Sequence, residues 1–139
     1  MKPVKAGSRP KSNLFRQSAR IGQAQTEAFH ALKENEPDQD AVERLQLALF
    51  NIQEHADDLT PDFLPARGDG RWFVFFFTQE EFDSSVFGPG TTFSVKAFQT
   101  QLGRVGVDGR AGIETLPFLD EIVAFLEARI GVLDQPTDF

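Results

Sequence analysis

The chain has 139 residues, of which 40% are hydrophobic and 25% charged, and its formal net charge is −7. This length fits one domain, with or without a tail, and no apolar run approaches the roughly 18 residues that a membrane helix needs. The chain has no cysteine and only two histidines. We therefore exclude disulfides and thiolate metal sites, and we expect no metal and no cofactor.

The charges are distributed unevenly along the chain. Residues 1–20 carry six cations and no acid, so the remainder holds eight cations against all 21 acids. Such an acidic body is poorly suited to a phosphate backbone, and we expect no nucleic-acid partner. The basic start is followed by no apolar segment of the kind found in a secretory signal peptide, which indicates a chain made in the cytoplasm.

The first 37 residues are predicted to form a basic leader. Pro3, Gly7 and Pro10 favour disorder up to Ser12. A helix with a thin apolar face then follows from about residue 14 to residue 34, capped by Ser12 or Asn13. The polar run at 34–40, which contains a proline, predicts the boundary with a folded domain at 38–133.

The folded domain is expected to open with a helix over about 41–55. Asp38 or Asp40 is its candidate cap, and apolar residues follow at helical spacing. After a loop at 57–65, the aromatic run at 71–77 favours a strand or an extended buried segment. Residues 79–82 suit a short turn of helix. The apolar residues of the first helix are Val42, Leu45, Leu49 and Ile52.

Two further helices are predicted in the second half of the chain. One begins at Thr91 or Thr92 and ends at Gly103. The other runs over about 114–130, after a tight loop around Asp108 and Gly109, and residues 134–139 should be frayed. These patterns predict a mainly α fold, a compact three-helix bundle with an inserted aromatic segment. The apolar stripes consist of Val95, Phe98 and Leu102, and of Leu116, Leu119, Ile122, Val123, Leu126 and Ile130.

Three segments in order resemble the peptidoglycan-binding-like domain, a small three-helix module appended to many cell-wall hydrolases. Residues 40–46 are similar to its first helix, residues 87–99 to its F-G-P-x-T turn and A-V-x-x-F-Q helix, and residues 107–116 to its closing V-D-G-x-x-G-x-x-T-L element. The motif positions are Phe87, Gly88, Pro89, Thr91, Val95, Phe98, Gly109 and Gly112.

Most of these motif residues also have a structural reading. Gly88 and Gly109 allow turns that a residue with a Cβ atom does not, and the hydroxyls of Thr91 and Thr115 suit helix caps. Gln99 should lie beside the core with its amide able to bind a loop carbonyl. The chain departs from the family in a long insertion at about 56–86, which enters where the family's ligand groove begins.

The resemblance implies non-catalytic binding of bacterial cell-wall peptidoglycan, through its stem peptide or its glycan, to target a linked activity to the wall. Arg110 would pair a carboxylate, Asp108 would accept from an amine or amide, and Trp72 would offer a stacking surface. A turn former, a solvated charge and a core residue are the respective structural alternatives. The expected contact residues are Trp72, Gln99, Asp108, Arg110 and Thr115.

Two other functions stay open at this point. The chain could be a protein-interaction module that docks a partner through the insertion or the leader. It could also be a small hydrolase, for which Glu80, Glu81, Asp83, Asp57 and Asp58 are the available carboxylates. A wall ligand lies outside the cytoplasm, so peptidoglycan binding would require delivery to the envelope by a non-classical route.

Overall fold

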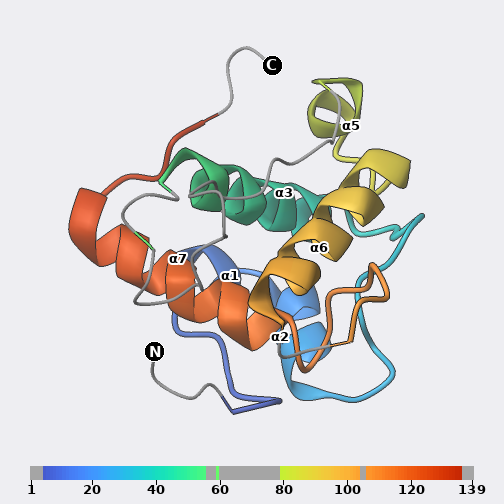
Figure 1. The fold of residues 1–139 in the computed structure, drawn as a ribbon, viewed down its shortest axis with the longest axis horizontal. Helices are drawn as coiled ribbons and strands as arrows, with labels where there is room; N and C mark the ends of the chain where they lie inside the picture. The colour runs from blue at the N-terminus through green and yellow to red at the C-terminus, as the bar shows by residue number, and fades with distance from the viewer. Residues whose placement is uncertain (1–4, 56–58, 60–78, 104–105, 136–139) are drawn as a thin grey trace.

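The computed structural model describes residues 5–55, 59, 79–103 and 106–135, and within them the fold is mainly helical, with no strand. Figure 1 shows α3 (Gln39–Glu54) next to α7 (Leu116–Ile130), with α6 (Pro89–Leu102) against α3 and the N-terminal helices packed against α7. The predicted aromatic strand, the loop at 57–65 apart from Leu59, and most of the insertion lie outside the described residues. The helices are α1 (Asn13–Arg16), α2 (Ala19–Thr26), α3 (Gln39–Glu54), α5 (Gln79–Ser84), α6 (Pro89–Leu102) and α7 (Leu116–Ile130).

The three long helices predicted for the domain are all present. Helix α3 begins after Asp38, whose carboxylate accepts a hydrogen bond from the backbone N–H of Ala41 at 3.0 Å. Helix α6 ends at Gly103, which has the left-handed φ of 67° expected of a glycine at a helix C-terminus. Helix α7 begins two residues later than predicted, at Leu116. The predicted apolar stripes face the core, except that Ile130 is only half-buried.

The start of α6 differs from the prediction that Thr91 or Thr92 caps it. The N-cap is Gly88, with Pro89 in the first turn, and no side chain of the cap accepts a hydrogen bond. Glu81 of α5 takes that role, because its carboxylate accepts from the backbone N–H groups of Gly88, Gly90 and Thr91 at 2.9–3.1 Å. A negative charge is favourable at this end of a helix. The cap of α6 thus comes from a different helix.

The single N-terminal helix predicted over 14–34 is in fact two short helices. Ser12 caps α1 by accepting from Phe15 N–H at 3.2 Å, and Ser18 caps α2 by accepting from Ile21 N–H at 3.1 Å. The second cap requires an extended backbone at Ser18, with φ −116° and ψ 112°, and this breaks the helix. Because serine side chains compete well for free N–H groups, the second serine ends one helix and starts the next.

The N-terminal segment is not a leader separate from the folded domain, as predicted, but part of the same fold. Its apolar side chains Phe15, Ile21, Ala24 and Leu32 are fully buried in the same core as the apolar faces of α3, α6 and α7. Residues 34–40 therefore link two parts of one core and do not divide a leader from a domain. The N-terminal segment supplies one wall of the helical fold.

Two carboxylates of α7 fasten the N-terminal segment. Asp120 is buried and accepts from the backbone N–H groups of Lys11 and Ser12 at 2.7 and 2.9 Å. Glu127, two turns further along, accepts from those of Asn13 and Leu14 at 2.8 and 3.0 Å. These bonds satisfy backbone donors at the start of α1, which would otherwise be left without partners.

Candidate functional site

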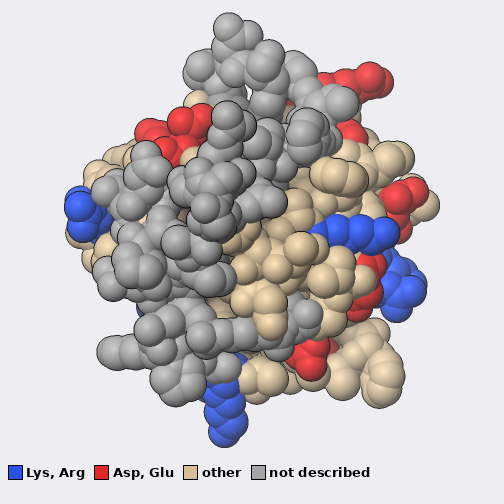
Figure 2. All heavy atoms as spheres, viewed as in Figure 1, with Lys and Arg blue, Asp and Glu red and all other residues tan. Residues whose placement is uncertain are grey.

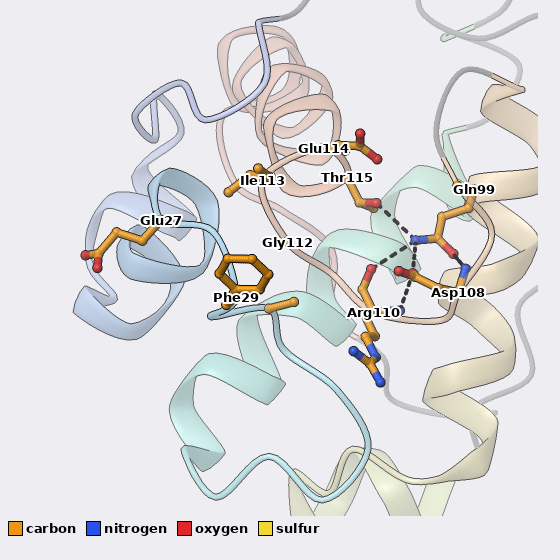
Figure 3. A pocket seen from close by; sticks show the side chains of 11 residues that line it. Glu27, Phe29, Gln99, Asp108, Arg110, Gly112, Ile113, Glu114 and Thr115 are labelled. Atoms are coloured by element: carbon orange, nitrogen blue, oxygen red, sulfur yellow. Dashed lines mark hydrogen bonds between the residues drawn. The ribbon is translucent and has the colours of Figure 1, made fainter.

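The side chain of Gln99, on α6, organises the loop between α6 and α7. Its amide nitrogen donates to the Asp108 carboxylate, the Arg110 carbonyl and the Thr115 hydroxyl at 2.9–3.0 Å. Its amide oxygen accepts from the backbone N–H groups of Asp108 and Gly109 at 3.1 and 3.0 Å. The expected bond from Gln99 to a loop carbonyl is confirmed at Arg110. One buried amide therefore fixes the path of this loop (Figure 3).

The loop needs two glycines to follow this path. Gly109 has φ +75°, and a Cβ atom there would lie 2.8 Å from the Thr92 methyl group. A Cβ atom on Gly112 would lie 2.9 Å from the Cβ of Ala31, because residue 111 pairs with residue 32 in an isolated antiparallel bridge. These close approaches hold the loop against both α6 and the N-terminal segment.

A pocket of about 230 Å³ lies between this loop and the N-terminal segment. The Phe29 ring lies across it from Gln99, Asp108 and Thr115 (Figure 3). The pocket therefore has a polar side built by α6 and its loop, and a further side built by residues that precede α3. It is lined by Glu27, Phe29, Ala31, Gln99, Gly106, Asp108, Arg110, Gly112, Ile113, Glu114 and Thr115.

Four of the five predicted contact residues line this pocket, and the fifth, Trp72, lies outside the described residues. Gln99 and Thr115 are buried and hydrogen-bonded to each other, so their main role is to hold the loop in its conformation. Thr115 is the N-cap residue of α7, but its hydroxyl makes no capping bond, contrary to the predicted role. Asp108 and Arg110 are exposed, and these two are free to meet a ligand.

The two exposed residues differ in how they are held. One carboxylate oxygen of Asp108 is occupied by Gln99 and by the backbone N–H of Arg110 at 2.9 Å. The Arg110 guanidinium makes no ion pair with any described residue. Within the described part of the chain, the pocket thus presents the Arg110 cation without an ion-pair partner and the Asp108 carboxylate in a fixed orientation.

The N-terminal side of the pocket was not anticipated. Glu27, Phe29 and Ala31 belong to the segment expected to be a leader, and they face the loop because Leu32 and Ala111 exchange two backbone hydrogen bonds of 2.8 Å. A bridge between residues 79 positions apart leaves no periodic signal in a sequence.

The other motif residues of the predicted family build the fold. Phe87, Val95 and Phe98 are fully buried in the core. The Thr91 hydroxyl donates to Glu81 at 2.8 Å and accepts from the Gln46 amide at 3.0 Å. Gly88 has an ordinary negative φ of −104°, and what it provides is space, since a Cβ atom there would lie 3.0 Å from the Glu81 carboxyl group.

The carboxylates considered for hydrolysis do not converge on this pocket. Glu81 is committed to the start of α6, and neither Glu80 nor Asp83 lines the pocket. Asp57 and Asp58 lie outside the described residues. Among the residues that are described, no three His, Cys, Asp or Glu side chains are grouped so as to hold a metal ion.

The described surface also carries its charges in a mixed arrangement. On the face drawn in Figure 2, Lys and Arg side chains do not form a continuous patch, and Asp and Glu lie among them. No helix within the described residues is long and apolar enough to cross a membrane.

Comparisons of the chain with protein-family models, with curated proteins and with solved structures give no match. The described residues themselves define a mainly helical protein with a polar pocket between its N-terminal segment and its α6–α7 loop.

Proposed function

We propose that this chain is a non-catalytic module that binds bacterial cell-wall peptidoglycan in the pocket between the α6–α7 loop and the N-terminal segment. The observation that carries the proposal is the convergence of Gln99, Asp108, Arg110 and Thr115 on one pocket. They are the residues that the sequence's resemblance to the peptidoglycan-binding-like domain implies as wall contacts.

The chemistry of the pocket suits a peptidoglycan fragment. The Arg110 guanidinium, which pairs with no described residue, can form a charge-assisted hydrogen bond with a carboxylate, and the Asp108 oxygen that accepts from no described residue can accept from an amine or an amide. Gln99 holds the Asp108 carboxylate and the backbone of Arg110 in place, which lowers the conformational entropy that this loop loses when a ligand binds. A single shallow pocket of this kind should bind with a Kd of about 0.1–1 mM.

Weak binding of this kind is useful for targeting. A module held at the wall raises the local concentration of any activity linked to it, without a contribution to the chemistry. We therefore propose that the chain brings a linked or partner activity to the wall, at the cell envelope.

Co-sedimentation with insoluble peptidoglycan sacculi tests this function. We expect the purified chain to sediment with sacculi, Arg110→Ala to reduce the bound fraction several-fold, and the turbidity of the suspension to stay constant. Arg16→Ala is the matched control, because it removes the same charge from an exposed position on α1, outside the pocket.

Each other outcome points to a different function. Clearing of the suspension would indicate a hydrolase and direct attention to Glu80, Glu81 and Asp83. Absence of sedimentation would overturn the wall-binding proposal and favour a protein-docking module, for which the fully exposed Phe29 is the structural argument.

A further inference from the structure

Phe29 combines two features that are unfavourable for an isolated protein. Its side chain is fully exposed, and its backbone has φ +68°, in the left-handed region that a bulky residue rarely adopts. Neither feature contributes to the core. Residues with strained backbones are found disproportionately at binding sites, and this favours a role for Phe29 in binding.

Several contacts hold the chain in place directly after Phe29. The Arg20 guanidinium donates to the carbonyls of His30 and Ala31 at 2.7 and 3.4 Å, and it pairs with the Glu36 carboxylate at 2.8 Å. Beyond them, Leu32 is held by its bridge to Ala111. The ring is therefore carried by an anchored loop and is presented at the pocket, across from the polar groups around Gln99 (Figure 3).

The rest of the pocket shows which ligand chemistry this ring would complement. Among the described lining residues, Glu27, Asp108 and Glu114 are acidic and Arg110 is basic. This balance disfavours a polyanion and suits a ligand that carries both an amine and a carboxylate. The half-buried Ile113 also lines the pocket, so an apolar group of the ligand would find two apolar partners.

The identity of the aromatic residue separates peptide from glycan. Tyrosine and tryptophan offer a polar edge that can bond to sugar hydroxyls, and phenylalanine does not. A phenylalanine beside an isoleucine is better matched to a small apolar side chain next to a carboxylate. A short peptide with a free terminal carboxylate and an amine meets all of these requirements.

We propose that Phe29 is a ligand-contacting residue that makes the pocket select the peptide portion of peptidoglycan over its glycan. Phe29 packs on a small apolar side chain of the peptide while Arg110 pairs its terminal carboxylate. This inference rests on the proposed function and adds to it a contact from the N-terminal segment, which lies outside the region of family resemblance.

The experiment titrates the ¹⁵N-labelled full chain with three probes: a synthetic stem tetrapeptide with a free terminal carboxylate, the same peptide amidated at that terminus, and a chitin tetrasaccharide. We expect the free-acid peptide to shift amide signals of residues 29 and 106–115. Amidation should weaken binding on the order of 10-fold, which corresponds to the loss of one charge-assisted contact. The tetrasaccharide should leave the spectrum unchanged.

Phe29→Gly is the decisive variant. Glycine accepts φ +68° without strain, so this variant should be at least as stable as the wild type and yet bind the peptide about 10-fold more weakly. Phe29→Trp should retain binding, because it keeps an aromatic face. Phe93→Ala is the matched control, since it removes another exposed phenylalanine that does not line the pocket.

The possible failures are distinguishable. If the wild type sediments with sacculi but Phe29→Gly binds the peptide normally, or if the tetrasaccharide is the probe that binds, the role of Phe29 is overturned and the wall-binding function stands. If the wild type binds neither sacculi nor any probe, the proposed function itself fails. Signals of residue 29 that shift with protein concentration alone would show self-association through this ring and would also overturn the inference.

Discussion

The carboxylate of Asp120, near the start of α7, accepts a hydrogen bond of 2.9 Å from the backbone N–H of Ser12, a residue 108 positions earlier in the chain. Both residues are buried. The second carboxylate oxygen of Asp120 accepts from the backbone N–H of Lys11 at 2.7 Å and from the side-chain amide of Gln25 at 3.3 Å. One side chain therefore joins the last helix to the start of α1 and to α2.

Asp120→Asn should destabilise the fold by about 1–3 kcal/mol, because the new amide places a donor against buried N–H groups that need an acceptor. Chemical denaturation measures the free energy of unfolding. The adjacent Glu121→Gln is the control. Among the described residues Glu121 makes an exposed ion pair with Lys11, so this substitution should cost no more than about 1 kcal/mol. Equal costs for the two variants would contradict the anchoring role of Asp120.

The ion pair between Lys11 and Glu121 should also change the pKa of the Lys11 amine. The hydrogen bond that the Lys11 ammonium donates to Glu121, together with the negative charge of that carboxylate, raises the pKa of the Lys11 amine above its ordinary value. A raised pKa means that the folded state holds this proton more tightly, so the small stabilisation is present at neutral pH and is lost as the pH rises through the raised pKa. NMR titration of the Lys11 side chain should show this pKa falling towards its ordinary value in Glu121→Gln. An unchanged pKa in the variant would contradict the pairing.

The buried amide of Gln99 should be costly to remove. Gln99→Leu has a similar volume but leaves the N–H groups of Asp108 and Gly109 without their acceptor, and we expect a loss of about 2–4 kcal/mol. Thermal unfolding checks this, with Thr100→Ala as an exposed control on the same helix. The amide signals of residues 106–115 should broaden in Gln99→Leu, and a loop that keeps its spectrum would show that other contacts suffice.

Glu81→Gln should destabilise α6 by about 0.5–2 kcal/mol, the usual range for loss of a helix cap, because the start of the helix loses both a negative charge and one acceptor. Hydrogen exchange of the first turn of α6 is the most direct measurement. Glu80→Gln removes a neighbouring exposed charge on α5 and should leave exchange unchanged. Faster exchange in both variants would indicate a general charge effect instead of a specific cap.

Two glycines should respond to alanine with opposite signs. Gly109→Ala places a side chain at φ +75° and against Thr92, so we expect a loss of about 1–3 kcal/mol. Gly22 lies in α2 with open space around it, and Gly22→Ala should gain about 0.4–1 kcal/mol. Melting temperatures of the two variants, compared with the wild type, should therefore move apart. A stabilised Gly109→Ala would show that the loop has a second conformation.

The helices were predictable where one local pattern decides the structure. The apolar spacing from Val42 to Ile52, with Asp38 ahead of it, was enough for α3, and Gly103 was enough for the end of α6. The cap of α6 was not predictable from its own residues. The acceptor is Glu81, on another helix, and the nearby threonines offered a local alternative that the structure does not use.

The site was predictable only on the side of the α6–α7 loop. Asp108, Gly109 and Gln99 lie within ten residues and define a turn that can be foreseen. The opposite side depends on the bridge from Leu32 to Ala111 and on the bonds from α7 to residues 11–14. These contacts join distant parts of the chain and leave no local pattern. The basic charge of the N-terminal segment suggested that it is exposed to solvent, whereas its backbone N–H groups donate to the carboxylates of Asp120 and Glu127.

The bonds from Asp120 and Glu127 to residues 11–14 also constrain the order of events during synthesis on the ribosome. The N-terminal segment emerges well before its partners on α7, so Phe15 and Ile21 have no complete core to enter until α7 has been translated. Apolar side chains in that interval are open to chaperones and to aggregation. Contacts of such large sequence separation also slow folding, because the intervening chain must be closed into a loop before they form.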